Sequence, residues 1–381
     1  MIPAIKKFQE KKWLRDMPRG KIRILFINWV DTNNFNAQSL NVREIARRLD
    51  SDIFHSTLFY EKAPDPTLLN QSSLSLVQIP ARLGTLMMLG EWLKGYDVIF
   101  RANLMRFTYL YVLMRKWMWL RDGSKMVDWL EGPFSKSMMP EPKWSQYLYK
   151  VIQKSVTYRV AITDYIAKNA FDTHGLITHC VIPIGVDTNF FSPPLRRDND
   201  KPTVLFVGHL IKRKGPMAVL LAAKYFPQIL FILVGAKRGN YYLRLYRVID
   251  KWKLNNVTFL DPMPHNQLVE LMRRCDILLH PSKLEGFPKV VLEGAATGLP
   301  AIIFDHYQAP AVLHDVTGFQ VKTVDEMVDR LGLLIRDQSL RERMGAAAVD
   351  YAQQFDWNSI VRRWEEIFIH LASNKQSKKP S

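Results

Sequence analysis

The stretch ILLHPSKLEGFPKVVLEGAATGLPAIIF, residues 277–304, combines two short apolar runs with a segment bounded by proline and glycine. The runs Ile277–His280 and Ala301–Phe304 are continuously apolar rather than alternating, which is typical of strands covered on both faces of a sheet. Between them, Pro288 stands at the first turn of an expected helix and Gly298 just past its end. Strand, helix and strand in this order predict one repeat of a parallel α/β sheet.

Similar apolar runs recur along the chain, with helical patterns between them. They are Lys21–Asn28, Asp97–Phe100, Lys125–Trp129, Tyr158–Ile162 and Val181–Pro183 in the first half, and Thr203–Val207, Leu230–Val234 and Val257–Leu260 ahead of the two quoted above. The alternation of strand and helix, repeated in both halves, predicts two doubly wound α/β domains.

Changes in composition along the chain predict its domain boundaries. A stretch rich in Pro, Asn, Asp and Arg, without apolar periodicity, is expected to link the domains. An amphipathic pattern near the carboxyl end predicts a helix with two tryptophans on its apolar face. The expected segments are a basic N-terminal extension at 1–20, a first domain at 21–190, a linker at 191–202, a second domain at 203–356, the amphipathic helix at 357–371 and a disordered tail at 372–381.

The chain of 381 residues carries 53 Lys and Arg against 36 Asp and Glu, a formal net charge of +17, with 48% hydrophobic residues. The apolar fraction excludes a disordered basic polymer, and the length suits two domains with separate cores. A surface this basic attracts polyanions, namely anionic membrane, nucleic acid or phosphorylated small molecules. Since no nucleic-acid-binding motif accompanies the charge, nucleic acid is not an expected partner.

The cysteines and the amino-terminal stretch favour a cytoplasmic setting. Cys180 and Cys275 form no CxxC motif, which excludes a disulfide scaffold and a cysteine-based zinc site. Lysines interrupt the first 21 residues, so no signal peptide is expected. The most apolar window, 104–120, contains Arg106, Arg115 and Lys116, so a clean membrane span of about 20 residues is not expected.

The loop GHLIKRKG, residues 208–215, follows an expected strand and suits a phosphorylated ligand. In sheets of this type, ligands sit outside the carboxyl ends of the strands. Glycines permit close backbone approach, and His209, Arg213 and Lys214 supply cationic groups. A solvated basic turn before a helix is an equally good interpretation of this loop taken alone.

The loop that opens the helix between the two quoted strands carries a second set of candidates. Glu285 would lie just before the helix, Glu293 about a turn inside it, and Gly286 and Phe287 would aim backbone N–H groups into the same space. Such a helix end attracts a diphosphate, and carboxylates accept hydrogen bonds from sugar or ribose hydroxyls. A nucleotide-sugar has both features, although Glu293 by itself is more often a solvent-facing helix residue.

The segment EGFPKVVLEGAATGLPAI resembles the E-x7-E signature of the family-four retaining glycosyltransferases of GT-B fold, with Glu285 and Glu293 as its glutamates. Other stretches that agree are VIPIGVD at 181–187, GHLIKRKG at 208–215 and FDWNSIVRRWEEIF at 355–368. The resemblance is close over the second half and holds only in outline over the first. It implies a GT-B architecture, in which two Rossmann-like α/β domains face a central cleft and the closing helix crosses back to the first domain.

The resemblance also implies residue roles and a reaction. Glu285 would contact the transferred sugar, Glu293 the ribose, and Lys214 the diphosphate. The remaining donor-binding residues would be His209, Arg213, Gly286, Phe287 and Pro288. The sugar would be transferred with retention at the anomeric carbon. Because protein cations would stabilise the leaving diphosphate, no metal or other cofactor is expected.

Several features depart from the family's pattern, among them Ile184 in place of the usual Asn and Ala311 in place of a frequent Glu. His209 stands where the family usually has Arg, and Leu130 stands where many relatives have a His at the end of a first-domain strand. The loop at 31–39 lacks the paired glycines of many relatives. Asn33 and Asn34 in this loop are candidates to contact an acceptor or a phosphate, and an Asx-rich turn that caps the next helix is an equally good interpretation.

Two carboxylates lie on either side of Leu130. Asp128 or Glu131 could orient an acceptor hydroxyl or accept its proton, as a carboxylate in a closed site can. A structural carboxylate at a strand end is the alternative interpretation.

A basic and aromatic cluster lies in the first half of the chain. Its members are Arg101, Arg106, Arg115, Lys116 and Arg121, interleaved with Phe107, Tyr109, Tyr111, Trp117 and Trp119. Basic residues beside Trp and Tyr suit the headgroup layer of an anionic bilayer. We therefore expect a peripheral enzyme on the inner face of the cell membrane, with a glycolipid or envelope polysaccharide precursor as acceptor. A buried helix with solvated basic ends is the alternative for the cluster.

The function expected from the sequence is that of a glycosyltransferase using a nucleoside diphosphate sugar. The departures at His209, Leu130 and the loop at 31–39 also suit a catalytically silent GT-B protein that binds a nucleotide-sugar. Release of a nucleotide from a nucleotide-sugar would distinguish the two.

Overall fold

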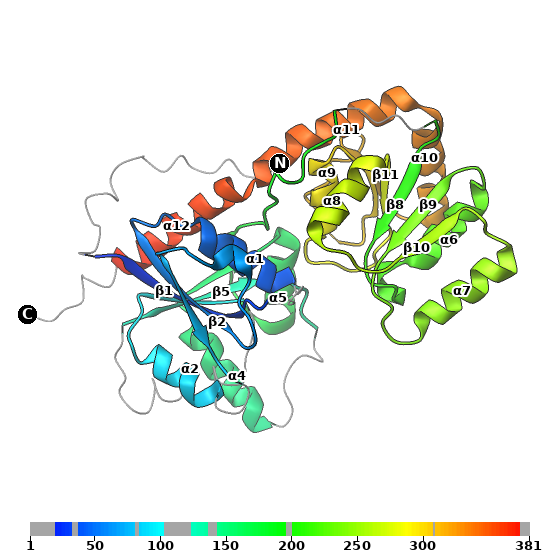
Figure 1. Ribbon diagram of the computed structural model, residues 1–381. Helices are drawn as coiled ribbons and strands as arrows, with labels where there is room; N and C mark the ends of the chain where they lie inside the picture. The colour runs from blue at the N-terminus through cyan, green and yellow to red at the C-terminus, as the bar shows by residue number, and fades with distance from the viewer. Residues whose placement is uncertain are drawn as a thin grey trace, which may run out of the picture. The chain divides into compact units, whose positions relative to one another are not determined.

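The chain forms two compact units, each built on a parallel β-sheet with helices packed on its faces (Figure 1). The computed structural model describes residues 20–32, 37–80, 84–102, 123–135, 143–195, 200–307 and 309–373. The first unit draws on Met1–Ile162, Ala167–Ile182 and Asn358–Ser381, and the second on Thr163–Ile166 and Pro183–Trp357. The expectation of two doubly wound α/β domains is confirmed.

In the described part of the first unit, the sheet has seven parallel strands in the order β3-β2-β1-β4-β5-β6-β7. The strands are β1 (Ile22–Trp29), β2 (Phe54–Tyr60), β3 (Leu74–Gln78), β4 (Val98–Arg101), β5 (Lys125–Leu130), β6 (Tyr158–Ala161) and β7 (Cys180–Val181). The helices described with them are α1 (Ala37–Arg48), η2 (Pro66–Leu68), α2 (Gly84–Trp92), α4 (Lys143–Ser155), α5 (Asp164–His174) and α12 (Trp357–Ser373). All the strands run in one direction, so the loops that follow them share one edge of the sheet.

The two faces of this sheet bury different side chains, because successive residues of a strand point to opposite sides. On one face α12 contributes Trp364, whose ring centroid lies 5.0 Å from that of Phe100 and 5.3 Å from that of Trp129. On the other face, Trp92 of α2 and Ile152 of α4 join a core with Leu25, Ile27, Ile99 and Met126. The carboxyl-terminal helix is therefore part of the first unit's core.

The sheet of the second unit has six parallel strands in the order β10-β9-β8-β11-β12-β13. They are β8 (Thr203–Val207), β9 (Leu230–Val234), β10 (Val257–Leu260), β11 (Ile277–His280), β12 (Ala301–Phe304) and β13 (Gly318–Val321). The helices are η4 (Lys212–Lys214), α6 (Pro216–Tyr225), α7 (Tyr241–Trp252), α8 (His265–Arg274), α9 (Lys289–Ala296), α10 (Val324–Arg336), α11 (Gln338–Ala352) and η5 (Gln353–Phe355). The quoted stretch thus folds as β11, α9 and β12, as its pattern predicts.

Helix α9 lies unusually close to its sheet. A Cβ atom added to Gly294 would come 2.8 Å from Cδ2 of Leu278 in β11, so only glycine allows this approach without a shift. Val291, Leu292 and Ala295 of the same helix are buried as well. This packing fixes the position of the residues at the start of α9.

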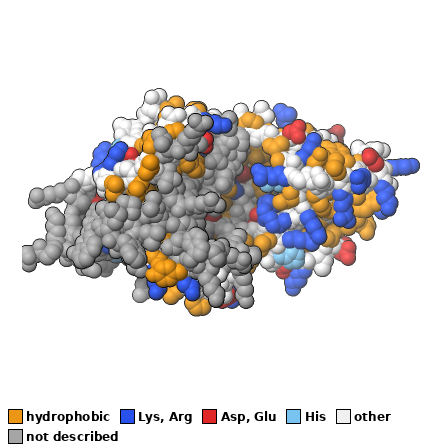
Figure 2. Space-filling model, turned by 90° about the horizontal axis from the view of Figure 1, so that it is seen from below, with side chains coloured by type: hydrophobic (Ala, Val, Ile, Leu, Met, Phe, Trp, Pro, Cys, Tyr) orange, Lys and Arg blue, Asp and Glu red, His pale blue; other side chains and the backbone are white. Residues whose placement is uncertain are grey.

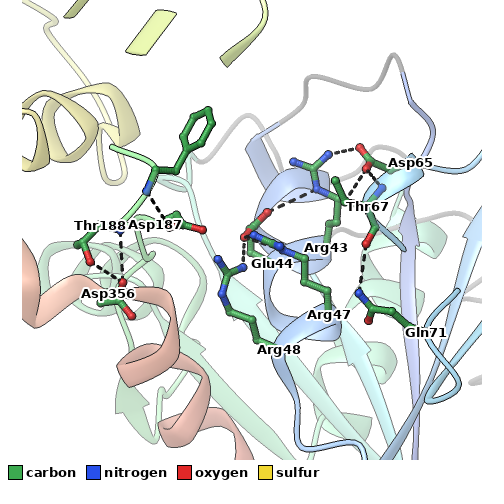
Figure 3. Close-up of polar contacts among 11 residues, drawn as sticks. Arg43, Glu44, Arg47, Arg48, Asp65, Thr67, Gln71, Asp187, Thr188 and Asp356 are labelled. Carbon is green, nitrogen blue, oxygen red and sulfur yellow. Dashed lines mark hydrogen bonds and ion pairs between the residues drawn. The ribbon is translucent and has the colours of Figure 1, made fainter. Parts of the chain in front are cut away.

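Apart from the short stretch Thr163–Ile166, the chain enters the second unit after Ile182 and leaves it after Trp357, and these two passages are tied together inside the second unit. Val186 N donates to Phe355 O at 2.9 Å, and Trp357 N donates to Val186 O at 3.0 Å. The hydroxyl of Thr188 donates to Asp356 Oδ2 at 2.8 Å, a contact visible in Figure 3. The two ends of the second unit are therefore joined by a short parallel bridge.

The change of unit falls between Ile182 and Pro183, ahead of the linker expected at 191–202. Arg273 of α8 explains part of this difference. Its Nε donates to Ser192 O at 2.9 Å and its Nη2 to Phe190 O at 3.2 Å. These bonds hold the stretch to the second unit, and composition does not reveal them.

Three strands, β2, β3 and β13, are missing from the set expected from apolar runs. In β2, Ser56 and Thr57 interrupt the apolar run, yet both are buried. The other two are edge strands of five and four residues. At the carboxyl end α12 continues through Ser373 with Ala372 buried, so the expectation of disorder from residue 372 is wrong for these two positions. The rest of the expected tail, and residues 1–19 of the extension, lie outside the described residues.

Positive charge lies at the surface of both units. In the first unit Glu44 of α1, 8% exposed, pairs with Arg47 at 2.6 Å and with Arg48, while Arg43 reaches Asp65 (Figure 3). Figure 2 shows Lys and Arg side chains spread over the visible face of the second unit, with hydrophobic side chains between them. In the parts of both units that the structure describes, basic side chains therefore lie on folded surfaces.

Candidate functional site

Most of the candidate residues lie in loops at one edge of the second unit's sheet. β8 ends at Val207, β11 at His280 and β12 at Phe304. Because these strands are parallel, the loops that follow them gather outside the same edge, where ligands bind in sheets of this kind. The loop at 208–215 and the loop at 281–288 meet there.

Glu285 is the centre of the polar contacts between these loops. Its Oε1 accepts a hydrogen bond from Nζ of Lys214 at 2.5 Å and another from the hydroxyl of Ser282. Nη1 of Arg213 lies 3.4 Å from the same oxygen, and Nε2 of His280 lies 3.6 Å from it. Across the residues that the structure describes, both hydrogen bonds to this carboxylate go to Oε1, so Oε2 is the oxygen that could accept from a ligand.

The Glu285 carboxylate is held in its ionised form. Burial alone would raise the pKa of a carboxylic acid, but His280 and Lys214 favour the charged form more strongly, and the pKa of Glu285 lies well below its ordinary value. The side chains of Glu285 and Lys214 are only 10% and 16% exposed, so water screens the pair little. An ionised carboxylate in this position can accept a hydrogen bond from a sugar hydroxyl at neutral pH.

The position of Lys214 depends on the glycine that follows it. Gly215 ends η4 with a φ of 74°, and a Cβ there would lie 2.0 Å from the carbonyl oxygen of Pro281. Lys283 N donates to Arg213 O at 2.9 Å, which joins the two loops a second time. The left-handed conformation and the close approach both require glycine here.

Glu293 is buried within α9, so the interpretation as a solvent-facing residue is wrong. The residue is 3% exposed, its Oε1 has no hydrogen-bond partner, and Nε2 of His265 lies 3.8 Å from that oxygen. Buried carboxylate oxygens are ordinarily hydrogen-bonded, and an unpaired one is costly. A hydroxyl of a bound ligand would supply the missing donor.

The amino-terminal end of α9 lies beside Glu285. Pro288 occupies the position before the helix, and no side chain caps the free N–H groups there. Phe287 is buried, with its ring centroid 5.8 Å from that of Phe355, which anchors the Gly286-Phe287 backbone just ahead of the helix. Free N–H groups and the helix dipole make such an end suitable for an anion.

His209 adds no charge to this edge near neutral pH. Burial lowers the pKa of its imidazole, and the positive charges of Arg238, Lys214 and Arg213 lower it further. In the described loops, the cationic groups beside Glu285 are therefore Arg213 and Lys214.

Sequence reasoning missed three residues of this site. His280 and Ser282 are fully buried, and Tyr307, in the loop after β12, is 3% exposed. The hydroxyl of Tyr307 and both ring nitrogens of His280 have no hydrogen-bond partner. A polar residue at the end of a continuously apolar strand, as in ILLH, is a signal that could have singled out His280.

In the first unit, Asp128 is engaged by a buried arginine. Nε and Nη2 of Arg101 each donate at 2.6 Å to a different carboxylate oxygen of Asp128, and Arg159 Nε lies 4.0 Å away. This bidentate pair favours the structural interpretation of Asp128. Glu131 Oε2 accepts from Nδ2 of Asn41 at 3.1 Å, which links β5 to α1.

Several expected sites lie outside the described residues. These are Asn33, Asn34 and the basic and aromatic cluster from Arg106 to Arg121. Within the described ranges, no group of three or more His, Cys, Asp or Glu side chains is placed to hold a metal ion. None of the described helices is both long and apolar enough to cross a membrane.

Comparison with protein families places a known domain in the second unit. Residues 187–350 match the family model described as glycosyl transferases group 1. This match includes Lys214, Glu285 and Glu293.

Two curated relatives are D-inositol 3-phosphate glycosyltransferases. The protein from Corynebacterium aurimucosum is 29% identical over 241 residues, which are 55% of this chain and 57% of that protein. The protein from Mycobacterium bovis is 28% identical over 240 residues, 58% of this chain and 50% of that protein. The matched region thus spans little more than half the length of these relatives.

Solved structures establish the fold as GT-B. Sucrose-phosphate synthase from Thermosynechococcus elongatus superimposes with a TM-score of 0.73 at 18% identity, over 93% of this chain and 100% of that one. Anabaena HepE in complex with UDP-glucose superimposes with a TM-score of 0.72 at 19% identity, over 91% of this chain and 99% of that one. WaaG, a glycosyltransferase involved in lipopolysaccharide biosynthesis, superimposes with a TM-score of 0.68 at 16% identity, over 91% of this chain and 99% of that one.

Proposed function

We propose that this chain is a retaining, metal-independent glycosyltransferase that moves a sugar from a nucleoside diphosphate sugar to an acceptor. The observation that carries the proposal is the Lys214–Glu285 pair at the amino-terminal end of α9, with Glu293 buried and unpaired inside that helix. All three lie within the matched glycosyl transferase domain.

The donor would be bound by groups of the second unit. Lys214 and Arg213 supply positive charge for the diphosphate, and the backbone N–H groups of Gly286 and Phe287 supply neutral donors. The unpaired Oε1 of Glu293 supports a role as acceptor for ribose hydroxyls. His209 and Pro288 complete the proposed donor site.

The proposed reaction breaks the bond between the anomeric carbon and the diphosphate oxygen, and the electron pair leaves with the diphosphate. Positive charge develops on the sugar ring and negative charge on the leaving group. Lys214 and the end of α9 stabilise the leaving group, so protein groups fill the role that a metal has in other enzymes. Oε2 of Glu285 would hold a sugar hydroxyl, and the acceptor oxygen would bond to the same face of the sugar, with loss of its proton.

In the first unit, Glu131 is the better candidate to accept that proton. The guanidinium of Arg101 holds both carboxylate oxygens of Asp128, which supports a structural role for Asp128. Asn33 and Asn34 stay candidates for acceptor contacts. The curated relatives are named for inositol 3-phosphate, so this phosphorylated polyol belongs among the acceptors tested.

A membrane-bound acceptor, a glycolipid or envelope polysaccharide precursor, is the finer part of the proposal. It would place the chain in the cytoplasm, on the inner face of the cell membrane. Leu86 and Leu93 in and after α2 are 68% and 52% exposed, and Tyr147 of α4 is 58% exposed. Because α2 and α4 pack on the same face of the sheet, these side chains support an apolar contact with a bilayer.

A flotation assay tests the membrane contact. The protein should rise with vesicles that contain anionic phosphatidylglycerol at low salt, and less so at high salt, because surface charges are screened. Protein that stays at the bottom of the gradient at low salt would refute the contact.

The donor site is tested by thermal shift and nucleotide release. UDP, GDP, ADP and CMP and their sugars are screened, beginning with UDP-glucose. One nucleotide should raise the melting temperature of the wild type, and Lys214→Ala or Glu293→Ala should abolish the shift. Lys212→Ala, an equal change of charge at an exposed position of the same turn, should keep it. A wild type that no nucleotide stabilises would overturn the proposal.

The second candidate is a catalytically silent GT-B protein that binds a nucleotide-sugar. The specific observation in its favour is the lowered pKa of His209, which leaves the diphosphate site one cation short near neutral pH. Stabilisation by a nucleotide, without release of that nucleotide from its sugar in the presence of any acceptor, would favour this candidate.

A further inference from the structure

Lys214 has two tasks in the proposed reaction. In the structure its ammonium neutralises Glu285 at 2.5 Å. In the donor complex the diphosphate competes for the same N–H donors. A largely buried carboxylate that loses its cation must gain other donors or take up a proton, because an ionised carboxylate is costly to bury unpaired.

Two buried groups without hydrogen-bond partners lie at the same edge of the sheet as this carboxylate: His280 ends β11, and Tyr307 follows the neighbouring strand β12. Nε2 of His280 is 3.6 Å from Glu285 Oε1, just beyond hydrogen-bond distance, and neither ring nitrogen has a hydrogen-bond partner. The hydroxyl of Tyr307 is also buried without a partner. Buried polar groups are ordinarily hydrogen-bonded, so two unpaired groups at one place point to bonds that form in another state of the site.

Both groups have the protonation state that this role requires. Burial lowers the pKa of His280, so its imidazole is neutral and one nitrogen keeps its hydrogen. Burial and the charge of Glu285 raise the pKa of Tyr307, so its hydroxyl stays a donor. The other ionisable groups that face Glu285 are His209 after β8 and Arg213 and Lys214 in η4.

We propose that His280 and Tyr307 are positioning residues that take over Oε1 of Glu285 when the donor diphosphate draws Lys214 away. Their hydrogen bonds keep Glu285 ionised and keep its Oε2 directed at the sugar. The inference rests on the proposed function and adds how the site keeps its charge after the donor binds.

The test compares Tyr307→Phe, His280→Leu and His280→Gln with the wild type, in full-length protein with UDP-glucose or whichever nucleotide-sugar the wild type uses. Tyr307→Phe removes one oxygen and leaves the packing intact, and Gln can replace the N–H of His280. Tyr225→Phe, the same change at an exposed position, is the matched control. The readouts are melting temperature, kcat and KM for the donor, and the pH dependence of kcat.

We expect Tyr307→Phe to melt at the wild-type temperature or above it, since it removes an unpaired buried hydroxyl. Its kcat should fall roughly tenfold, the effect of losing one hydrogen bond to a charged group, with little change in KM. The loss of activity on the acid side should begin at a higher pH, because fewer donors favour ionised Glu285. His280→Leu should behave alike, and His280→Gln should recover most of kcat.

If Tyr307→Phe and His280→Leu have the same kcat and the same pH dependence as the wild type, the inference is overturned and the proposed function still stands. Equal losses in His280→Leu and His280→Gln, with lowered melting temperatures and an unchanged pH profile in all variants, would assign His280 and Tyr307 to packing and also overturn it. A wild type that neither binds nor uses any nucleotide-sugar would overturn the proposed function, and the inference with it.

Discussion

The protonation states of single residues in the candidate site depend on their neighbours more than on the ordinary pKa of each side chain. Glu285 is largely buried, which should favour a neutral acid, yet Lys214 and His280 keep it charged. His209 is more accessible, yet burial and three nearby cations keep it neutral. Charge at this edge of the sheet is therefore a property of the group of residues.

The depressed pKa of Glu285 predicts a pH-dependent contribution to stability. A carboxylate whose pKa is lowered on folding stabilises the native state above its unfolded pKa, and this stabilisation is lost as the pH falls. At pH 7, Glu285→Gln should lower the free energy of unfolding by about 2 kcal/mol, the worth of hydrogen bonds to a charged group. The difference in the free energy of unfolding between Glu285→Gln and the wild type should shrink as the pH falls below 4.5, the ordinary pKa of a glutamate.

Urea unfolding of the wild type and Glu285→Gln between pH 7 and pH 4 measures this difference. Glu342→Gln, at an exposed position of α11, is the control and should change little. A difference that grows towards acid pH would contradict the lowered pKa.

The neutral His209 predicts tighter donor binding at lower pH. Under the proposed function, protonation of the imidazole adds a cation beside the donor diphosphate, so the affinity for the nucleotide-sugar that the wild type binds should rise as the pH falls from 7.5 to 5.5. His209→Arg carries the charge at every pH and should bind about fivefold tighter at pH 7.5, or about 1 kcal/mol. Calorimetric titration at several pH values measures both effects, and equal affinities of wild type and His209→Arg at pH 7.5 would exclude His209 from the diphosphate site.

The secondary-structure elements that position the site depend on glycines at close approaches. At Gly215 a Cβ would meet the Pro281 carbonyl oxygen at 2.0 Å, whereas at Gly239, which has a similar positive φ, nothing lies within 4 Å. An alanine would therefore strain the backbone at both positions, but only at Gly215 would its Cβ clash with neighbouring atoms. They form a matched pair for mutation.

Gly215→Ala should cost more stability than Gly239→Ala and should also weaken nucleotide binding. Strain alone costs about 1 kcal/mol at either position, and the clash at 215 should raise the total to roughly 3 kcal/mol. The clash also displaces Lys214 from the loop at 281–288. Chemical unfolding measures the stability, and thermal shift with UDP measures nucleotide binding. Equal results for both variants would show that the close contact between Gly215 and Pro281 affects neither.

The sequence predicts those elements in which local pattern and final burial agree. β11 and β12 match the expected runs at 277–280 and 301–304, since both are covered on both faces. β2 is not predicted, because Ser56 and Thr57 are polar in sequence but buried by neighbouring strands in the fold. Long-range packing decides such cases.

The same distinction holds for the candidate site. Lys214, Glu285 and Glu293 are predicted because loops after strands and helix starts follow from local pattern. His280 and Tyr307 are not, because only the folded sheet shows that their polar atoms are buried without partners. The close pairing of Asp128 with Arg101 likewise depends on the register of β4 and β5.

Across the chain, the two units should respond separately to mutation and to ligand. Trp364 of α12 is fully buried, and the aromatic rings that it packs against among the described residues, those of Phe100, Trp129 and Phe368, all belong to the first unit. Trp364→Ala should destabilise the first unit by about 3–5 kcal/mol, and Tyr147→Ala, at an exposed position, by less than about 0.5 kcal/mol.

Calorimetry with and without the stabilising nucleotide separates the two responses. Trp364→Ala should lower the transition of the first unit, and the nucleotide should still raise that of the second. A nucleotide shift lost in Trp364→Ala would show that donor binding needs an intact α12.

The backbone bridge between Val186 and residues Phe355 and Trp357 holds the two ends of the second unit's main segment side by side. Apart from the four residues Thr163–Ile166, the second unit is one continuous insertion in the first, Pro183–Trp357, and the bridge holds the two ends of this insertion together. Insertions whose ends lie together disturb their host least. Residues 183–357 could therefore be exchanged between related genes as one block, so that donor and acceptor preferences would be inherited and engineered independently.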